Sequence, residues 1–190
     1  MSDYSRERAD ELLIKYVKTP HIVVHSYATE AVMRKLAERF APDDSQMWAM
    51  GGLLHDLDED EVDWRSDMSL HGPRSVEILK EEGYGSLEMY NAILAHNPKN
   101  GYKIKNAFDR CMYAADPMTG FINAIAKVYP DQKVKSVKLK SIVKRMDETR
   151  FAAGANRDAM WSIELLGIDF EDFAKIALEA MCEIDAVLGL

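Results

Sequence analysis

Apolar residues recur at every third or fourth position along most of this chain, and no segment alternates apolar and polar residues as a strand would. The last helix is the clearest, because its apolar residues from Phe170 to Leu188 fall on one face. We expect a break at Asp116-Pro117, where proline interrupts the pattern. Other helices are expected over about 9–17, 22–40, 46–55, 72–82, 86–95, 106–115 and 117–128. The pattern therefore predicts an all-α fold, an irregular helical bundle.

Composition limits the class of protein further. The chain has 190 residues, 47% of them hydrophobic, and no linker-like stretch divides it, so we expect a single domain over 1–190. Within it, we expect a core over about 22–128 and a helical extension over about 129–190. The formal charge of −8 argues against nucleic acid as a partner.

The cysteines and the lack of long apolar runs indicate the cellular compartment. Cys111 and Cys182 lie in helical apolar patterns, as reduced thiols do, rather than in close-spaced pairs. The first residues contain no apolar signal region, and no apolar run approaches ~20 residues. We therefore expect a cytoplasmic protein without a membrane partner.

The stretch 48-WAMGGLLHDLDED-60 ends an apolar helix in a histidine and an aspartate. Neighbouring residues lie ~100° apart around a helix axis, so His55 and Asp56 can converge on one ion only near a helix end. A structural alternative is a capped helix end, in which His55 offsets the helix dipole and Asp56 is solvated.

The remaining histidines also have structural explanations when each is taken alone. His25 shares a helical face with apolar residues and points inward, while His21 lies at a fraying helix start after a proline. His71 precedes a helix, and His96 ends an apolar segment. Asp116 before a proline is a good N-cap.

Together, these residues indicate a metal site. Their order, H…HD…H…H…D, places imidazoles and carboxylates near helix ends or on buried faces, which is what a two-metal site needs. Mixed nitrogen and oxygen ligands suit iron, manganese, zinc or cobalt better than magnesium. Several histidines in one core without a metal would leave donors and acceptors unpaired.

Three segments resemble the HD superfamily of metal-dependent phosphohydrolases: HSYATEAVMRKLA, LLHD and YAADPMTGF, over about 25–120. The resemblance implies a bundle of the HD-domain type with one or two divalent ions. It also implies the ligands. One ion would be held by His25, His55, Asp56 and Asp116, and the second by Asp56, His71 and His96, with Asp56 bridging.

The residues after the doublet indicate which side chain would accept a proton from water. Members with an HDIGK motif carry a lysine where this chain has Glu59, whereas HDLDE is closer to the HDxxE form of nucleotidase-like members. In that form the glutamate handles a water proton, so Asp56 and Glu59 are the catalytic candidates, with Asp58 as an alternative proton acceptor. Apart from Asp56 and Glu59, we expect the acids of the run 56–63 to be solvated.

The leading hypothesis is a metal-dependent hydrolase that acts on a small phosphate ester, nucleotides included. A phosphate needs a cation among these acids, and Arg74 is the nearest candidate. The basic segment 133–150 is a second candidate, although a solvated helical face explains it better. Arg150, Asn156 and Arg157 could close over a substrate, but capping and pairing between helices explains them better.

Two other functions use the same residues. A di-iron oxygenase of a polyol or a phosphonate would need the same ligand order, and only the metal distinguishes it from a hydrolase. A non-catalytic metal-binding or sensor module usually lacks one or more ligands, and here none is missing. A homodimer is also compatible with the eleven methionines and the apolar last helix, although core packing accounts for both.

Overall fold

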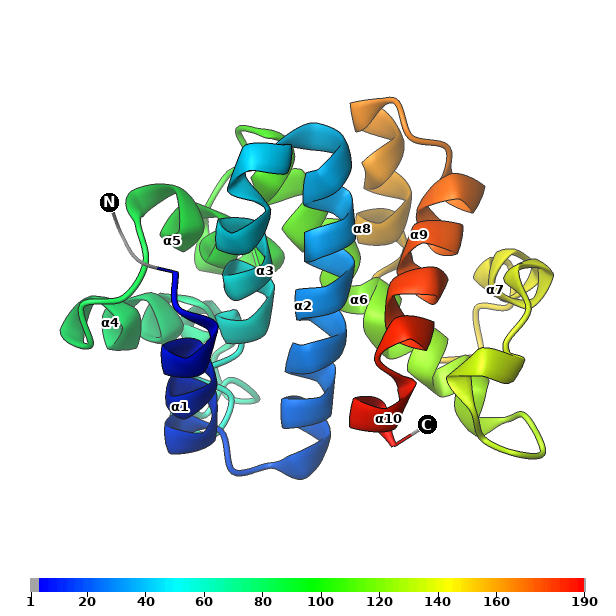
Figure 1. Cartoon of the computed structure of the whole chain (residues 1–190), viewed down its shortest axis with the longest axis horizontal. Helices are drawn as coiled ribbons and strands as arrows, with labels where there is room; N and C mark the ends of the chain where they lie inside the picture. Colours follow the sequence, from blue (N-terminus) through cyan, green and yellow to red (C-terminus); the bar gives the residue numbers. More distant parts are fainter. Residues whose placement is uncertain (1–3, 190) are drawn as a thin grey trace.

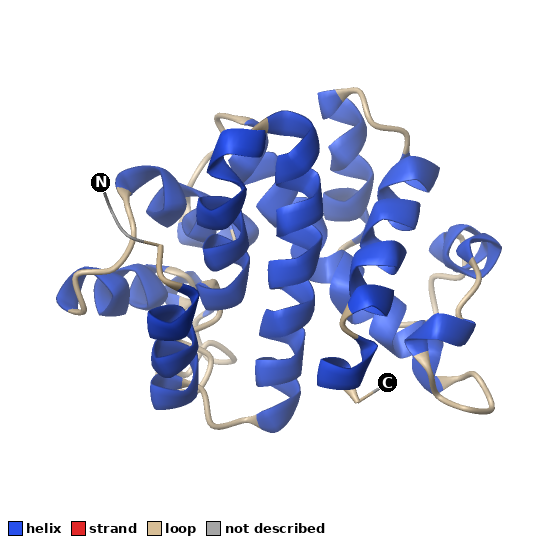
Figure 2. Ribbon diagram, viewed as in Figure 1, coloured by secondary structure: helices blue, strands red, loops and turns tan. Residues whose placement is uncertain are grey.

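The architecture is helical throughout the part of the chain that the computed structural model describes, residues 4–189, and no strand occurs there (Figures 1 and 2). The predicted all-α fold is confirmed. No helix within these residues is both long and apolar enough to cross a bilayer. The α-helices are α1 (Arg6–Tyr16), α2 (Pro20–Phe40), α3 (Ser45–Leu54), α4 (Pro73–Glu81), α5 (Leu87–His96), α6 (Ala107–Lys127), α7 (Leu139–Met146), α8 (Arg157–Trp161), α9 (Phe170–Glu183) and α10 (Asp185–Leu188).

Helices α2 and α3 pack against each other at the centre of the bundle (Figure 1). A Cβ placed on Gly52 of α3 would lie 2.7 Å from the carbonyl oxygen of Thr29 on α2, so the two backbones approach more closely than any other residue would allow. His25 lies about one turn before Thr29, and His55 about one turn after Gly52. The contact therefore sets the spacing between two histidine-bearing turns.

Helix α6 runs through the predicted break. The structure has one helix of 21 residues with Pro117 inside it, so the prediction of two helices is wrong. Proline removes one backbone hydrogen bond, but α6 is buried on both sides of it, from Met112 and Ala115 to Phe121. Packing of this face outweighs the local cost. Asp116 consequently lies in mid-helix, and the N-cap explanation for it is wrong.

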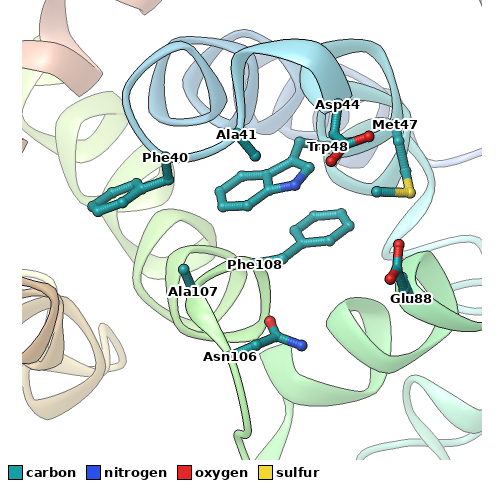
Figure 3. A pocket seen from close by; sticks show the side chains of 9 residues that line it. All are labelled: Phe40, Ala41, Asp44, Met47, Trp48, Glu88, Asn106, Ala107 and Phe108. Carbon is teal, nitrogen blue, oxygen red and sulfur yellow. The ribbon is translucent and has the colours of Figure 1, made fainter.

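An aromatic stack joins the helices at the opposite end of α3. The rings of Trp48 (α3) and Phe108 (α6) are parallel within 6°, with centroids 4.6 Å apart, and Phe40 at the end of α2 stacks on Trp48 at 6.5 Å (Figure 3). A hollow of about 290 Å³ borders these rings, with Asp44 and Glu88 in its wall. The stack thus fastens together α2, α3 and α6, the three helices that surround His25, His55 and Asp116.

The C-terminal part packs on this core through α9, which contacts α2 and α6 (Figure 1). The predicted helix 170–188 is interrupted at Ile184, which leaves the helical region with φ −114° and ψ 21°. The basic segment lies on α7 and the turns beside it, where a solvated face accounts for it. Its exposed members are Lys133, Lys135, Lys138, Lys140, Lys144 and Arg150.

The Gly52 contact generates the first prediction. Gly52→Ala should lower the free energy of unfolding by about 1–3 kcal/mol, because the added methyl group meets the Thr29 carbonyl and forces α2 and α3 apart. Urea denaturation measures the change. Gly120→Ala is the matched control, since a Cβ at Gly120 in α6 meets nothing within 4 Å. That control should gain up to about 1 kcal/mol from helix propensity. Equal stability of Gly52→Ala and the wild type would contradict this account of the packing.

Candidate metal centre

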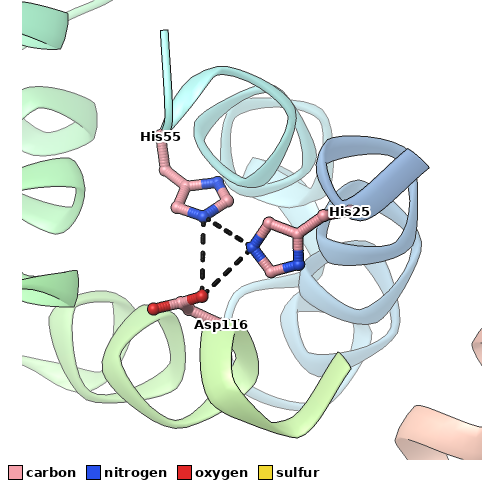
Figure 4. Close-up of side chains that lie close together, drawn as sticks. All are labelled: His25, His55 and Asp116. Carbon is pink, nitrogen blue, oxygen red and sulfur yellow. Dashed lines mark hydrogen bonds and ion pairs between the residues drawn. The ribbon is translucent and has the colours of Figure 1, made fainter. Parts of the chain in front are cut away.

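Three helices bring His25, His55 and Asp116 to one point (Figure 4). The Nε2 atom of His25 lies 3.2 Å from Nε2 of His55 and 3.1 Å from Oδ1 of Asp116. Nε2 of His55 lies 3.8 Å from the same carboxylate oxygen. These residues come from the first half of α2, the end of α3 and the middle of α6, so the site exists only in the folded bundle.

A second group joins Asp56, His71 and His96. Oδ1 of Asp56 lies 3.3 Å from Nε2 of His71, 3.6 Å from Nε2 of His96 and 3.2 Å from Nε2 of His55. Its other oxygen lies 3.5 Å from Nε2 of His25. One carboxylate is therefore close to all four imidazoles and lies between the two groups, where the predicted bridging ligand would have to be.

Each of the four imidazoles is held through its Nδ1 atom, and its Nε2 atom faces the centre. Nδ1–H of His55 donates to the Gly52 carbonyl at 2.8 Å, and that of His96 donates to the Ile93 carbonyl. His25 and His71 use the Thr119 hydroxyl at 3.1 Å and the Asp58 carboxylate at 2.8 Å. Such partners leave the Nε2 lone pair for a metal. His55 and His96 thus bind helix-end carbonyls and face the centre at once, because each role uses a different nitrogen.

Two buried atoms at this centre lack a hydrogen-bond partner among the described residues, Oδ1 of Asp56 and Nε2 of His96. Buried polar atoms are nearly always paired, so these two indicate an absent partner. Histidine nitrogens with carboxylate oxygens form a donor set suited to iron, manganese, zinc or cobalt. The residues present therefore fit one or two divalent transition-metal ions.

The centre balances carboxylates against imidazolium groups. Burial lowers the pKa of His55, but the carboxylates of Asp56 and Asp116 outweigh burial and raise the pKa to about 10. Burial raises the pKa of Asp56, yet the positive charges of the nearby His55 and His71 imidazolium groups hold that pKa well below its ordinary value. Burial and the neighbouring imidazolium charges lower the pKa of His96 to about 4. A bound cation would take over this neutralisation and displace the protons.

Asp58 contradicts the expectation that the remaining acids are solvated. Its side chain is 0% exposed. The carboxylate accepts from Nδ1–H of His71 at 2.8 Å, from Gly72 N at 2.6 Å and from Ser75 N at 3.1 Å. It sits at the N-terminus of α4, where backbone N–H groups stabilise an anion. Asp58 therefore orients His71. The sequence carries no signal that separates Asp58 from the neighbouring acids, which lie in the same interval between the doublet and the HGPRS segment.

Glu59 lies half-buried beside the second group, and its carboxylate has no hydrogen-bond or ion-pair partner among residues 4–189. Burial, followed by the negative charge of Asp56, raises the pKa of Glu59 to about 7. Glu59 is thus an unengaged carboxylate near the centre, whereas both oxygens of Asp58 are occupied.

Two arginines differ in how they are held. Arg74 pairs with Glu77 at 3.3 Å and with Glu81 at 3.2 Å along α4. Arg65, which the sequence did not single out, lies with Cζ 4.2 Å from the ring centroid of Trp64, and the Trp64 ring is 6.4 Å from the ring of His71. Within the described part of the chain, Arg65 has no ion pair. The signal was a Trp-Arg pair in an otherwise acidic loop that leads to His71.

Three further candidates lie outside the two groups. His21 is exposed near the start of α2. Asn156 caps α8 by accepting from Ala159 N at 3.0 Å, and Arg157 donates to carbonyls of the preceding segment. Capping and pairing therefore account for Asn156 and Arg157, as expected.

The family comparison agrees with this geometry. The family model for the HD domain matches residues 22–150, which is more than half of the chain. The chain therefore belongs to the HD-domain family, whose members are generally metal-dependent hydrolases. A search of curated proteins and a search of solved structures returned no match.

The role of Asp58 can be tested through metal affinity. Asp58→Asn keeps the shape of the side chain but removes the charge that orients His71, and outer partners of this kind are worth about 10–100-fold in affinity. Titration with manganese should show that one of the two ions binds with lower affinity and that the affinity for the other is unchanged. Asp63→Asn is the control, because Asp63 belongs to the same acidic run but is exposed, and its side chain bonds only Ser66. Two unchanged affinities in Asp58→Asn would show that Asp58 does not orient a ligand.

Proposed function

We propose that this protein hydrolyses a small phosphate monoester at a dinuclear centre. The ligands would be His25, His55, Asp56, His71, His96 and Asp116. The observation that carries the proposal is the position of the Asp56 carboxylate, whose oxygens lie 3.2–3.6 Å from Nε2 of all four histidines and whose buried Oδ1 accepts no hydrogen bond. When bound, the ions lower the pKa of a coordinated water and neutralise the phosphoryl oxygens.

The chain would supply the proton acceptor through Glu59. This carboxylate has no partner, and its backbone N–H donates to the Asp56 carbonyl at 3.1 Å, which fixes it beside the bridging ligand. Net hydrolysis consumes one water and gives an alcohol and inorganic phosphate. Glu59 would accept a proton from that water, which is the role of a general base.

The chain would supply the phosphate-binding cation through Arg65. The acids around the doublet repel a phosphate, so a guanidinium that is not already paired is required nearby. Arg74 is committed to Glu77 and Glu81, while Arg65 is held only by its stacking on Trp64. Arg65 therefore replaces Arg74 as the proposed substrate-binding residue.

Activity of the purified protein tests the proposal. With manganese or iron, the protein should release phosphate from at least one member of a panel of small phosphate esters that includes nucleotides. Asp56→Ala should lower kcat/KM by more than about 100-fold, since even residues that only support ligands are worth 10–100-fold. His21→Ala, which changes an exposed histidine outside both groups, should retain activity. Oxygen uptake with a polyol or phosphonate by the iron-loaded protein, with no ester cleaved, would overturn the hydrolase in favour of an oxygenase.

The two arginines are separated by phosphate binding. Calorimetry with manganese-loaded protein and inorganic phosphate should show about tenfold weaker binding for Arg65→Ala, in line with the loss of a charge-assisted hydrogen bond. The phosphate affinity of Arg65→Lys should lie between those of the wild type and Arg65→Ala, and the affinity of Arg74→Ala should match that of the wild type. Weakened binding in Arg74→Ala alone would return the role to Arg74.

A further inference from the structure

A cavity of about 430 Å³ opens beside the His25, His55 and Asp116 group. His25 and Asp116 form part of its wall, so the cavity is continuous with the metal centre. The rest of the wall comes from α6, with Pro117 and Phe121, and from the segment 147–156, with Ala152 and Ala155. Pockets that bind small molecules start at about 300 Å³, so this cavity can hold a compact organic group.

The wall of this cavity is almost uncharged. Among its lining residues, His25 and Asp116 are the only ones with a titratable side chain, and both face the centre. Asn156 contributes an amide that is partly engaged: Oδ1 accepts from Ala159 N, and Nδ2 donates one of its two N–H groups to the Tyr113 hydroxyl at 3.2 Å. What remains for an occupant is one N–H group of Asn156 and a lining of small or apolar residues: Pro117, Gly120, Ala152, Gly154 and Ala155.

The segment that lines one side of the cavity is fixed in place. The guanidinium of Arg157 donates to the carbonyls of Met146 at 3.0 Å, Glu148 at 3.1 Å and Phe151 at 2.6 Å. It also donates to the carbonyl of Ala152 at 3.3 Å, and Ala152 has a φ of 43°, a conformation that non-glycine residues rarely adopt. Backbone strain of this kind persists only where the surroundings enforce it. The wall is therefore preorganised.

The cavity and the proposed proton acceptor border different ligand groups of the centre. The cavity touches members of the first group only, whereas Glu59 follows Asp56 and lies near His71, both of the second group. In an in-line displacement the entering and leaving oxygens lie on opposite sides of phosphorus. The leaving group would then face the cavity.

We propose, on the basis of the proposed hydrolase function, that this cavity binds the uncharged, mainly apolar organic group of the substrate. The substrate class is then a phosphate monoester of a compact neutral alcohol, with room for about one ring. Polyphosphates and esters of charged alcohols are disfavoured, because the cavity wall offers no cation to a second anionic group.

Ligand binding tests this inference without turnover. The probes are inorganic phosphate and phenylphosphonate, a stable analogue of a phosphate monoester that carries one neutral ring. Calorimetry with manganese-loaded wild type should show phenylphosphonate binding about tenfold more tightly than phosphate, from burial of the ring. Equal affinities would overturn the cavity assignment and leave the hydrolase proposal in place. Absence of binding by both probes would overturn the two together.

Filling the cavity provides the second measurement. Gly120 lines the cavity on α6, and a Cβ there meets nothing within 4 Å, so a side chain at this position starts in open space beside the cavity. Gly120→Leu should lose the tenfold preference for phenylphosphonate, while its affinity for phosphate and its metal content stay as in the wild type. Gly120→Ala should keep the preference. Ala186→Leu, which adds the same side chain at a separate hollow lined by Asp131 and Lys133, should also keep it. A full preference in Gly120→Leu would overturn the inference.

Discussion

The backbone contact between Gly52 of α3 and the Thr29 carbonyl of α2 sets the spacing on which the candidate metal centre depends. The same turn of α3 supplies the Gly52 carbonyl that orients His55, and Thr29 lies one turn beyond His25. A side chain at position 52 would separate the two helices and, with them, two imidazoles whose Nε2 atoms are 3.2 Å apart. The close packing of these two helices therefore determines the distance between the imidazoles of His25 and His55.

Charge is the second constraint on the centre, because several carboxylates are buried there and their negative charges must be neutralised. Buried ions are costly unless they are paired, and the raised pKa values of His55 and His71, about 10 and about 11, show where the pairing comes from. The expectation of one or two divalent ions follows from the same balance. Asp58 accepts a hydrogen bond from Nδ1–H of His71, so an acid outside the two groups also contributes to this balance of charge.

The sequence predicted the structure best where the signal was a local pattern that recurs along the chain. Periodicity located most helices, and the order of histidines and aspartates indicated the residues that the fold brings together. It was misleading where packing decides: Pro117 is accommodated because α6 is buried around it, and a proline signal carries no information on that burial. Asp58 was indistinguishable from its acidic neighbours, since its partners at Gly72 and Ser75 are defined by the loop that returns to α4. Arg65 was overlooked because its significance lies in Trp64 and in the absence of an ion pair.

The central claim is that six residues hold two ions with Asp56 between them. Anomalous diffraction from crystals of the manganese-reconstituted protein, measured at the manganese edge, tests it most directly. The account predicts two peaks per chain, one bounded by His25, His55 and Asp116 and the other by His71 and His96, with the Asp56 carboxylate between the peaks. A single peak that does not touch Asp56, or no peak at these residues after reconstitution, would contradict it.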